Sequence, residues 1–171
     1  MTGSPNATFI TLIPKKDSPK YFYDYLVIHI CNLVYNMVTK IIANKLKPKL
    51  SEFISKEQFV FLDNRKILHS IGTTQECIHT LKTKHKSYVV MKLDLAKAYG
   101  KVNWDFLSLV LLQIGITEHV MSWIMACSSS ANFAVLINGS PTYFFKSSRG
   151  LRQGLLLSPL IFLLVIEGIS K

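Results

Sequence analysis

Residues 89–102 have the sequence VVMKLDLAKAYGKV, which combines a structural pattern with a candidate site. The first half is a run of β-branched and long apolar residues, and this predicts a buried strand. Asp94 ends the run as a single carboxylate. Because burying an unpaired charge is costly, we expect Asp94 to lie at an exposed strand end, facing a solvated cleft or a cation. A purely structural aspartate is the alternative on this pattern alone.

Other strand signals lie on both sides of this stretch, and helical patterns are mixed with them without a regular βαβ repeat. We therefore predict an α+β fold. One strand is expected over residues 8–14. Another is expected over 134–137, with Asn138-Gly139 as a hairpin turn and a return strand at 143–146. We expect the strand before Asp94 to pair with one of the two strands of this hairpin.

Apolar spacing and capping residues predict five helices. They are expected at 34–46, closed by Pro48; from a Thr73/Glu76 capping box through Leu81; at 104–114, between Asn103 and Gly115; around 118–127, with Val120, Trp123 and Ile124 facing inward; and from Ser158-Pro159 onward. Asp63-Asn64 is a turn candidate in the connector.

The composition favours a polyanionic partner. The 171 residues suit one domain, or one piece of a larger protein, and carry a formal net charge of +10. Residues 40–101 contain thirteen Lys or Arg against five Asp or Glu. Nucleic acid and an anionic membrane surface are both candidate partners, and a solvated lysine-rich face is the alternative. A mean hydropathy of +0.28 indicates apolar surface intended for neighbours.

The cysteines and the apolar runs bear on the cellular setting. Three widely spaced cysteines predict no disulfide framework and a reducing compartment. The longest apolar run, 155–166, is too short to span a bilayer. We recognise no secretory signal at the start of the chain, so we expect an intracellular location, in the nucleus or the cytoplasm, and no membrane partner.

Two motifs make the chain recognisable. RGLRQG at 149–154, followed by Leu-Ser-Pro at 157–159, comes after LDLAKAY at 93–99. Together they resemble the reverse transcriptase domain of non-LTR (LINE-type) retrotransposons, particularly the plant type. The resemblance covers nearly the whole chain, and it also includes residues 9–16, 24–47, Gln58, Phe61, Arg65 and the hairpin at 138–145.

The resemblance implies a right-hand polymerase that copies an RNA template from a DNA primer with deoxynucleoside triphosphates. Residues 1–88 correspond to fingers, and 89–171 to a partial palm that ends before the Asp-Asp hairpin, with the thumb absent. Asp94 matches the first catalytic aspartate, a ligand of two Mg²⁺ ions. The other matching positions are Tyr99, under the incoming sugar; Gln153 and Gly154, beside nucleotide and template; and Lys15 and Arg65, as phosphate or template contacts or as plain surface charges.

Three departures from the family pattern suggest a partly degenerate copy. Leu26 stands where an arginine would hold the triphosphate, Gly100 where an aspartate follows the aromatic residue, and Leu155-Leu156 where Asp-Pro is usual. Two hypotheses follow. The chain is a piece of an RNA-directed DNA polymerase that is inactive on its own, or it is a non-catalytic, basic nucleic-acid-binding remnant. Asp94 alone is not expected to hold two magnesium ions.

Overall fold

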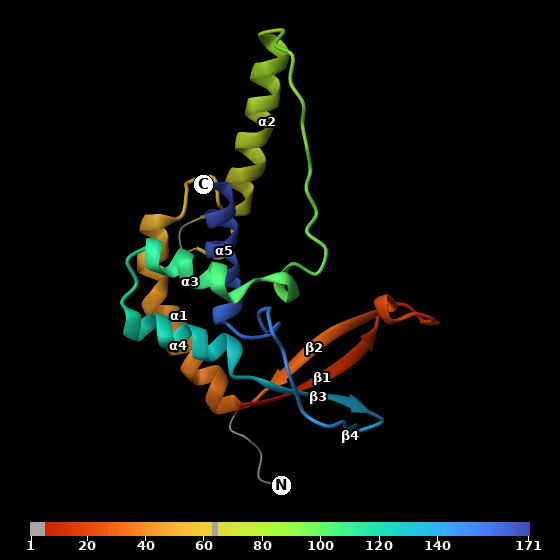
Figure 1. Cartoon of the computed structure of the whole chain (residues 1–171). Coiled ribbons are helices and arrows are strands. Elements are labelled where there is room, and N and C mark those ends of the chain that lie inside the picture. Colours follow the sequence, from red (N-terminus) through yellow and green to blue (C-terminus); the bar gives the residue numbers. More distant parts are fainter. Residues whose placement is uncertain (1–5, 63–64) are drawn as a thin grey trace.

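A computed structural model describes residues 6–62 and 65–171, which contain five α-helices and one five-stranded mixed sheet (Figure 1). The predicted mixture of helices and strands is confirmed. The Asp63-Asn64 turn lies outside the described residues. Within the described ranges, no helix combines the length and the apolar character needed for a bilayer crossing.

The sheet is built on a long hairpin. Strands β1 (Ala7–Pro14) and β2 (Tyr25–Cys31) pair antiparallel, from Thr8 opposite Cys31 to Pro14 opposite Tyr25. Strand β3 (Asn132–Ile137) lies parallel to β1 on its other side. The short strands β4 (Ser140–Pro141) and β5 (Phe145–Lys146) return along β3. The expected strands over 8–14 and 134–137 are therefore confirmed.

Two further features of the sheet concern its turns and edges. Asn138 and Gly139 have φ of 50° and 81°, and a two-residue Asn-Gly hairpin turn requires positive φ at both positions, so the predicted turn is confirmed.

Strand β2 was missed by sequence reasoning. Its apolar run has no clear boundary signals, and it becomes a strand because β1 offers it a full pairing edge.

Four helices pack into one hydrophobic core beside the sheet. They are α1 (Leu33–Phe53), α3 (Trp104–Gln113), α4 (Glu118–Ser129) and α5 (Leu157–Ser170). The large apolar side chains that are fully buried come from these helices alone within the described residues: Leu50, Leu107, Leu111, Ile124, Leu157, Ile161 and Leu164. Asn103 caps α3 by accepting from the N–H groups of Asp105 and Phe106, as predicted.

Several predicted boundaries are wrong. Helix α1 continues through Pro48 to Phe53, because burial of the flanking Leu46 and Leu50 offsets the missing hydrogen bond. Helix α5 begins at Leu157, so Ser158 is buried inside its first turn and is not the N-cap. The inward face of α4 is only partly right, since Ile124 is fully buried while Trp123 is 46% exposed.

Helix α2 (Ile67–Thr83) and the extended segment that follows it project together away from the other elements (Figure 1). We call residues 66–97 the arm, and residues 6–62 and 98–171 the body. No residue of α2 is buried. The predicted Thr73 capping box is wrong, because α2 starts six residues earlier and the Thr73 hydroxyl donates to the His69 carbonyl, 2.9 Å away, inside the helix.

The strand predicted before Asp94 is also wrong. Residues 87–95 are extended and exposed, and they pair with neither strand of the hairpin. The physical reason is that a strand pattern needs an open edge. Both edges of β3 are occupied, by β1 on one side and by β4 and β5 on the other. Asp94 is exposed, as expected, but in an unpaired segment.

Candidate functional site

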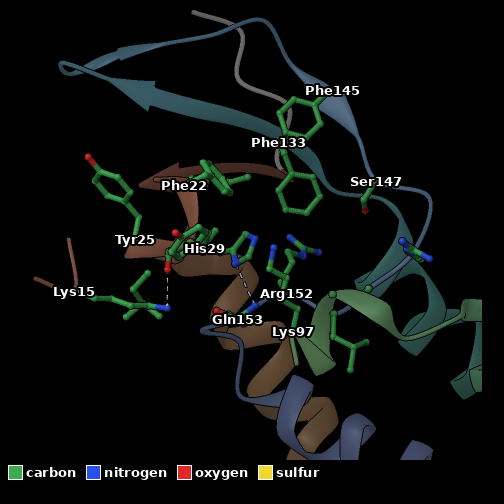
Figure 2. A pocket seen from close by; sticks show the side chains of 18 residues that line it. Lys15, Phe22, Tyr25, His29, Lys97, Phe133, Phe145, Ser147, Arg152 and Gln153 are labelled. Atoms are coloured by element: carbon green, nitrogen blue, oxygen red, sulfur yellow. Dashed lines mark hydrogen bonds between the residues drawn. The ribbon is translucent and has the colours of Figure 1, made fainter. Parts of the chain in front are cut away.

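A cavity of about 590 Å³ lies between the β1–β2 hairpin and the loop that leads to α5 (Figure 2). Four of its lining residues are cationic, namely Lys15, Lys97, Arg149 and Arg152, and none of the lining residues within the described ranges is acidic. The wall also carries aromatic side chains: Phe22, Tyr23, Tyr25, Phe133 and Phe145. Such a cavity suits an anionic ligand that also has an apolar or planar part.

Lys15 is positioned by the turn between β1 and β2. Its backbone N–H donates to the Asp24 carbonyl at 2.8 Å. The buried Asp24 carboxylate in turn accepts from the N–H groups of Lys20 and Tyr21, at 2.9 and 3.0 Å, and pairs with Lys16 at 2.8 Å. The Lys16 ammonium, helped by these two N–H groups, lowers the pKa of Asp24. Asp24 therefore fixes the turn that carries Lys15.

The opposite wall is a loop that is clamped to the segment before α3. The N–H of Gly150 donates to the Val102 carbonyl and that of Leu151 to the Tyr99 carbonyl, both at 2.8 Å. Gly150 has φ of 97°, and a Cβ atom there would come within 3.0 Å of the Gly100 carbonyl oxygen. Both the conformation and the close approach require glycine at position 150.

Arg152 ties three elements together beneath the cavity. Its side chain is 3% exposed, and its guanidinium donates to Asn6 Oδ1 at 2.8 Å, Thr8 Oγ1 at 3.1 Å, the Tyr35 hydroxyl and the Cys127 carbonyl. None of these partners is an anion. Burial raises the pKa of Tyr35, which keeps the phenol neutral beside the cation. We call Arg152 and these four hydrogen-bond partners the arginine hub. The hub connects β1, α1 and α4, and so fixes the loop that contains Arg152.

Gln153 lies against strand β2. Its backbone N–H donates to Nδ1 of His29 at 3.3 Å (Figure 2). Burial and the nearby Arg152 charge lower the pKa of His29, so the neutral ring can accept this hydrogen bond. Gly154 has φ of 102°, and a Cβ atom there would lie 3.3 Å from the His29 carbonyl oxygen.

The structure brings together only some of the residues singled out from the sequence. Lys15 and Gln153 both line the cavity, and Gly154 follows directly. Tyr99 does not line it; its ring stacks on Phe162 in the body at 4.8 Å, with an interplanar angle of 19°. Asp94 is exposed in the arm and is also not part of the cavity wall.

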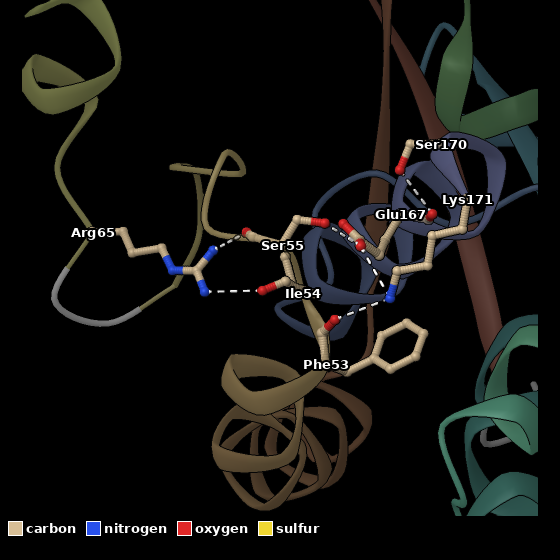
Figure 3. A network of polar contacts seen from close by, with 7 residues as sticks. All are labelled: Phe53, Ile54, Ser55, Arg65, Glu167, Ser170 and Lys171. Carbon is tan, nitrogen blue, oxygen red and sulfur yellow. Dashed lines mark hydrogen bonds and ion pairs between the residues drawn. The ribbon is translucent and has the colours of Figure 1, made fainter. Parts of the chain in front are cut away.

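Arg65 lies beside the C-terminal end of α1 and not at the cavity. Its guanidinium donates to the carbonyls of Ile54 and Ser55 at 3.1 and 2.5 Å (Figure 3). It also donates to the Gln58 carbonyl at 2.7 Å. These bonds satisfy the carbonyl groups that follow a helix end. A phosphate or template contact by Arg65 stays a prediction, and the position has a clear structural use.

Beside Arg65, a buried carboxylate joins α5 to the end of α1 (Figure 3). Glu167 is fully buried, accepts from the Ser55 hydroxyl and pairs with Lys171 at 3.3 Å. Lys171 also lies 3.8 Å from the centre of the Phe53 ring. Burial opposes ionisation of Glu167, but the Ser55 bonds and the Lys171 charge outweigh it and lower its pKa.

Sequence reasoning did not single out three of these residues: His29, Arg152 and Glu167. His29 and Glu167 are polar side chains inside otherwise apolar runs, and that position was the available signal, whereas Arg152 belongs to the RGLRQG motif without having been assigned a role. Such residues are buried only when they find partners, so each marks a tertiary contact. For metal binding, no group of three or more His, Cys, Asp or Glu comes together within the described ranges. Asp94 has no such companions there, and the described residues do not fit a two-magnesium site.

Comparison with known proteins adds to this geometry. The family model for reverse transcriptase (RNA-dependent DNA polymerase) matches residues 13–171. The chain is 27% identical over 158 residues to a Xenopus laevis protein described as the transposon TX1 uncharacterized 149 kDa protein. It is 25% identical over 158 residues to a retrovirus-related Pol polyprotein from the type-1 retrotransposable element R2 of Popillia japonica. Each match covers 92% of this chain, but only 12% and 22% of those relatives.

Proposed function

Because the chain belongs to the reverse transcriptase (RNA-dependent DNA polymerase) family, we propose that it forms the nucleotide-contacting part of a retrotransposon polymerase. Residues 1–88 would supply the fingers and residues 89–171 the first part of the palm. The RNA template, the DNA primer and the incoming deoxynucleoside triphosphate are the proposed ligands. The related transposon proteins support the retroelement origin.

The cavity is the observation that carries this proposal. A deoxynucleoside triphosphate combines several negative charges with a flat base, and the cavity wall combines four cations with aromatic side chains. Lys15 and Lys97 approach from the hairpin and from the segment before α3, so the triphosphate would bridge two parts of the chain (Figure 2). Leu26 also lines the cavity, at the position where the family pattern has an arginine.

Binding of a fluorescent deoxynucleoside triphosphate tests the proposal. Lys15→Ala and Lys97→Ala should each weaken binding about tenfold at low salt, since a contact to a charged group contributes roughly 1.5 kcal/mol. Lys49→Ala is the matched control, because Lys49 is an exposed lysine of α1 outside this cavity. Equal loss in all three variants would contradict a site in the cavity.

We further propose that the 171-residue chain does not extend a primer by itself. Magnesium ions supply the charge stabilisation in this kind of phosphoryl transfer, and several carboxylates are needed to hold them. Asp94 is the candidate first ligand, but the described residues bring it no partners. Extension of a labelled primer, run beside Asp94→Ala, is the assay. Extension that the variant abolishes would show that Asp94 finds other carboxylates and would overturn the proposal.

A second candidate function is nucleic-acid binding without catalysis, and the far end of the arm favours it. Lys82, Lys84 and Lys86 are exposed there. The thirteen basic residues of 40–101 do not form one patch, because others lie on α1, in the connector and at the cavity. Both candidate functions act on nucleic acid, so a nuclear or cytoplasmic location is part of the proposal.

The salt dependence of duplex binding distinguishes specific contacts by the lysines of the arm from a general effect of the net positive charge of the chain. Replacing Lys82, Lys84 and Lys86 together by alanine should reduce the log–log salt slope of duplex binding by up to about 2.7, because each phosphate that a lysine neutralises adds roughly 0.9 to the slope. The same triple replacement at Lys40, Lys45 and Lys49 of α1 is the control. A slope that falls equally in both triple variants would show that the lysines act only through net charge.

A further inference from the structure

His29 on β2 has one ring nitrogen bound to the loop before α5 and the other available to a ligand. Nδ1 accepts from the backbone N–H of Gln153 at 3.3 Å, so Nδ1 carries no proton and the neutral ring holds its proton on Nε2. Among the residues that the structure describes, Nε2 has no hydrogen-bond partner, and it is not shielded from solvent. The contact with Gln153 therefore leaves Nε2–H as an unused donor.

The ring of His29 is held in the wall of the cavity (Figure 2). On β3, the Phe133 ring meets it edge-on, with ring centroids 5.6 Å apart and an interplanar angle of 70°. On β1, the residue opposite His29 in the sheet is the apolar Ile10. The ring is therefore fixed between two strands and the loop, at a place that a ligand in the cavity can reach.

The charged groups that surround His29 in the cavity wall are all cationic. Lys15 comes from the β1–β2 turn, Lys97 from the segment before α3, and Arg149 and Arg152 from the loop before α5; the other titratable groups of the wall are the phenols of Tyr23 and Tyr25. Burial, followed by the Arg152 charge, lowers the pKa of His29. A polyanion bound among these groups favours the charged ring and so acts in the opposite direction.

We propose that His29 binds the triphosphate of the incoming nucleotide, donating Nε2–H to a phosphate oxygen while Nδ1 takes up one proton from solvent. This inference rests on the proposed binding of nucleotide in the cavity and adds a residue to it. Protonation of Nδ1 ends the hydrogen bond from Gln153. That loss is small, because 3.3 Å is long for such a bond, whereas a charge-assisted bond from the imidazolium to phosphate is roughly twice as strong as a neutral one.

The sequence of β2 gives His29 a reason for this role. Leu26 stands where the family pattern has an arginine that would hold the triphosphate, and His29 is the only Lys, Arg or His of this strand. Both side chains line the cavity. His29 therefore supplies a cation from the same strand, and it does so when an anion is bound beside it.

The pH dependence of nucleotide affinity tests the proton uptake. A fluorescent deoxynucleoside triphosphate should bind the wild-type chain more tightly as the pH falls from about 8 to 5, by up to roughly tenfold for each unit by which the ligand raises the pKa of His29. His29→Gln keeps a donor and an acceptor but takes up no proton, so it should lack this gain. The terminal phosphate titrates equally in both experiments and cancels in the comparison. His79→Gln, at an exposed position of α2 outside the cavity, is the matched control.

The sign of the effect separates a ligand contact from a structural role. If His29 only held the loop through Gln153, protonation would loosen the loop and weaken nucleotide binding at low pH, which would overturn the proposal. Inorganic triphosphate is the second probe, and it should show the same gain that depends on His29, because the contact is to phosphate. A gain with the nucleotide but not with inorganic triphosphate would overturn the assignment of the contact to phosphate.

Titration of the His29 ring protons by NMR, with and without inorganic triphosphate, measures the coupling directly, and the pKa should rise when the anion binds. Lys15→Ala separates the outcomes for the two proposals. Binding that Lys15→Ala weakens, with a pH profile that His29→Gln leaves unchanged, would overturn the role of His29 alone. Binding that neither substitution affects would overturn the nucleotide site in the cavity as well.

Discussion

The body and the arm both carry large apolar side chains, but the two regions expose them to very different extents. In the body, side chains such as Leu50 and Leu164 are fully buried, and the polar Arg152 and Glu167 are buried with partners. In the arm, α2 buries no residue, and Val89 is 88% exposed. Apolar pattern alone therefore does not determine burial; an element is buried only when the chain brings another surface to it.

The difference has a consequence for stability. Burial contributes to folding in proportion to the apolar area removed from water, so most of the stabilisation of this chain comes from the body. The arm has little buried surface and mostly solvent-exposed helix hydrogen bonds, which are the features of a segment that opens locally at low cost. Matched substitutions in the two regions should therefore have very different effects.

Leucine truncation should give the largest contrast. Leu50→Ala in α1, where the side chain is fully buried, should lower the free energy of unfolding by about 2–5 kcal/mol, because it removes buried methyl groups and leaves a cavity. Leu68→Ala in α2, where the side chain is 74% exposed, should change it by no more than about 0.5 kcal/mol. Urea unfolding of both variants is the measurement. Comparable losses would mean that the arm is packed in solution.

The arginine hub should give the next largest effect. Arg152→Met keeps an apolar stem but leaves Asn6 and Thr8 without the guanidinium donor, while the Cys127 carbonyl keeps only the Tyr35 hydroxyl as a donor, and we expect a loss of about 2–3 kcal/mol. Arg149→Met is the control within the same loop, because Arg149 is exposed. Equal effects of the two substitutions in urea unfolding would show that the hub does not stabilise the body.

The contrast between the two regions also explains which elements were predicted correctly from the sequence and which were not. Local signals identified α3 from Asn103 to Gly115 and the hairpin turn at Asn138-Gly139, because caps and turns are decided by neighbouring residues. The strand before Asp94 was wrong because pairing is a tertiary property, and both edges of β3, its expected partner in the hairpin, are occupied. The predicted helix end at Pro48 was wrong for a related reason, since burial of Leu46 and Leu50 in the core outweighs the local tendency of proline to end a helix.

The candidate site was predicted to a similar extent. Motif resemblance identified Lys15 and Gln153, which line the cavity from opposite sides. The partners that hold them there, Asp24 for the Lys15 turn and His29 for Gln153, were not singled out as site residues. These partners are distant in sequence or lack a motif, and only the pairing of β1 with β2 and the folding of the loop onto β2 bring them together.

Alanine substitution at two helical glycines should have opposite effects in the body and in the arm. A Cβ atom at Gly168 in α5 would lie 2.7 Å from Cγ2 of Val110, so Gly168→Ala requires the Val110 side chain or helix α3 to shift. We expect a net loss of up to about 2 kcal/mol after the gain in helix propensity. A Cβ atom at Gly72 in α2 would meet nothing within 4 Å, so Gly72→Ala should increase the helical stability of the arm by roughly 0.5–1 kcal/mol. Circular dichroism during thermal unfolding distinguishes the two, and a stabilising Gly168→Ala would contradict the close packing.

The smallest expected effect is a pH dependence that arises in the body. Burial and the Arg152 charge lower the pKa of His29 below its ordinary value of 6.5, so protonation is disfavoured in the folded chain. The stabilisation is fully present above pH 6.5 and is lost as the pH falls through the folded-state pKa, because the unfolded chain then binds the proton more readily. Protonation also removes the Nδ1 acceptor of the Gln153 N–H, so the loop beside the cavity should loosen in the same pH range.

Titration of the His29 ring protons by NMR gives the pKa directly, and His29→Gln should flatten the fall in stability over this pH interval. The matched control is His79→Gln, at an exposed position of helix α2. A His29 that titrates at or above pH 6.5 would show that the loop does not hold the ring in its neutral form.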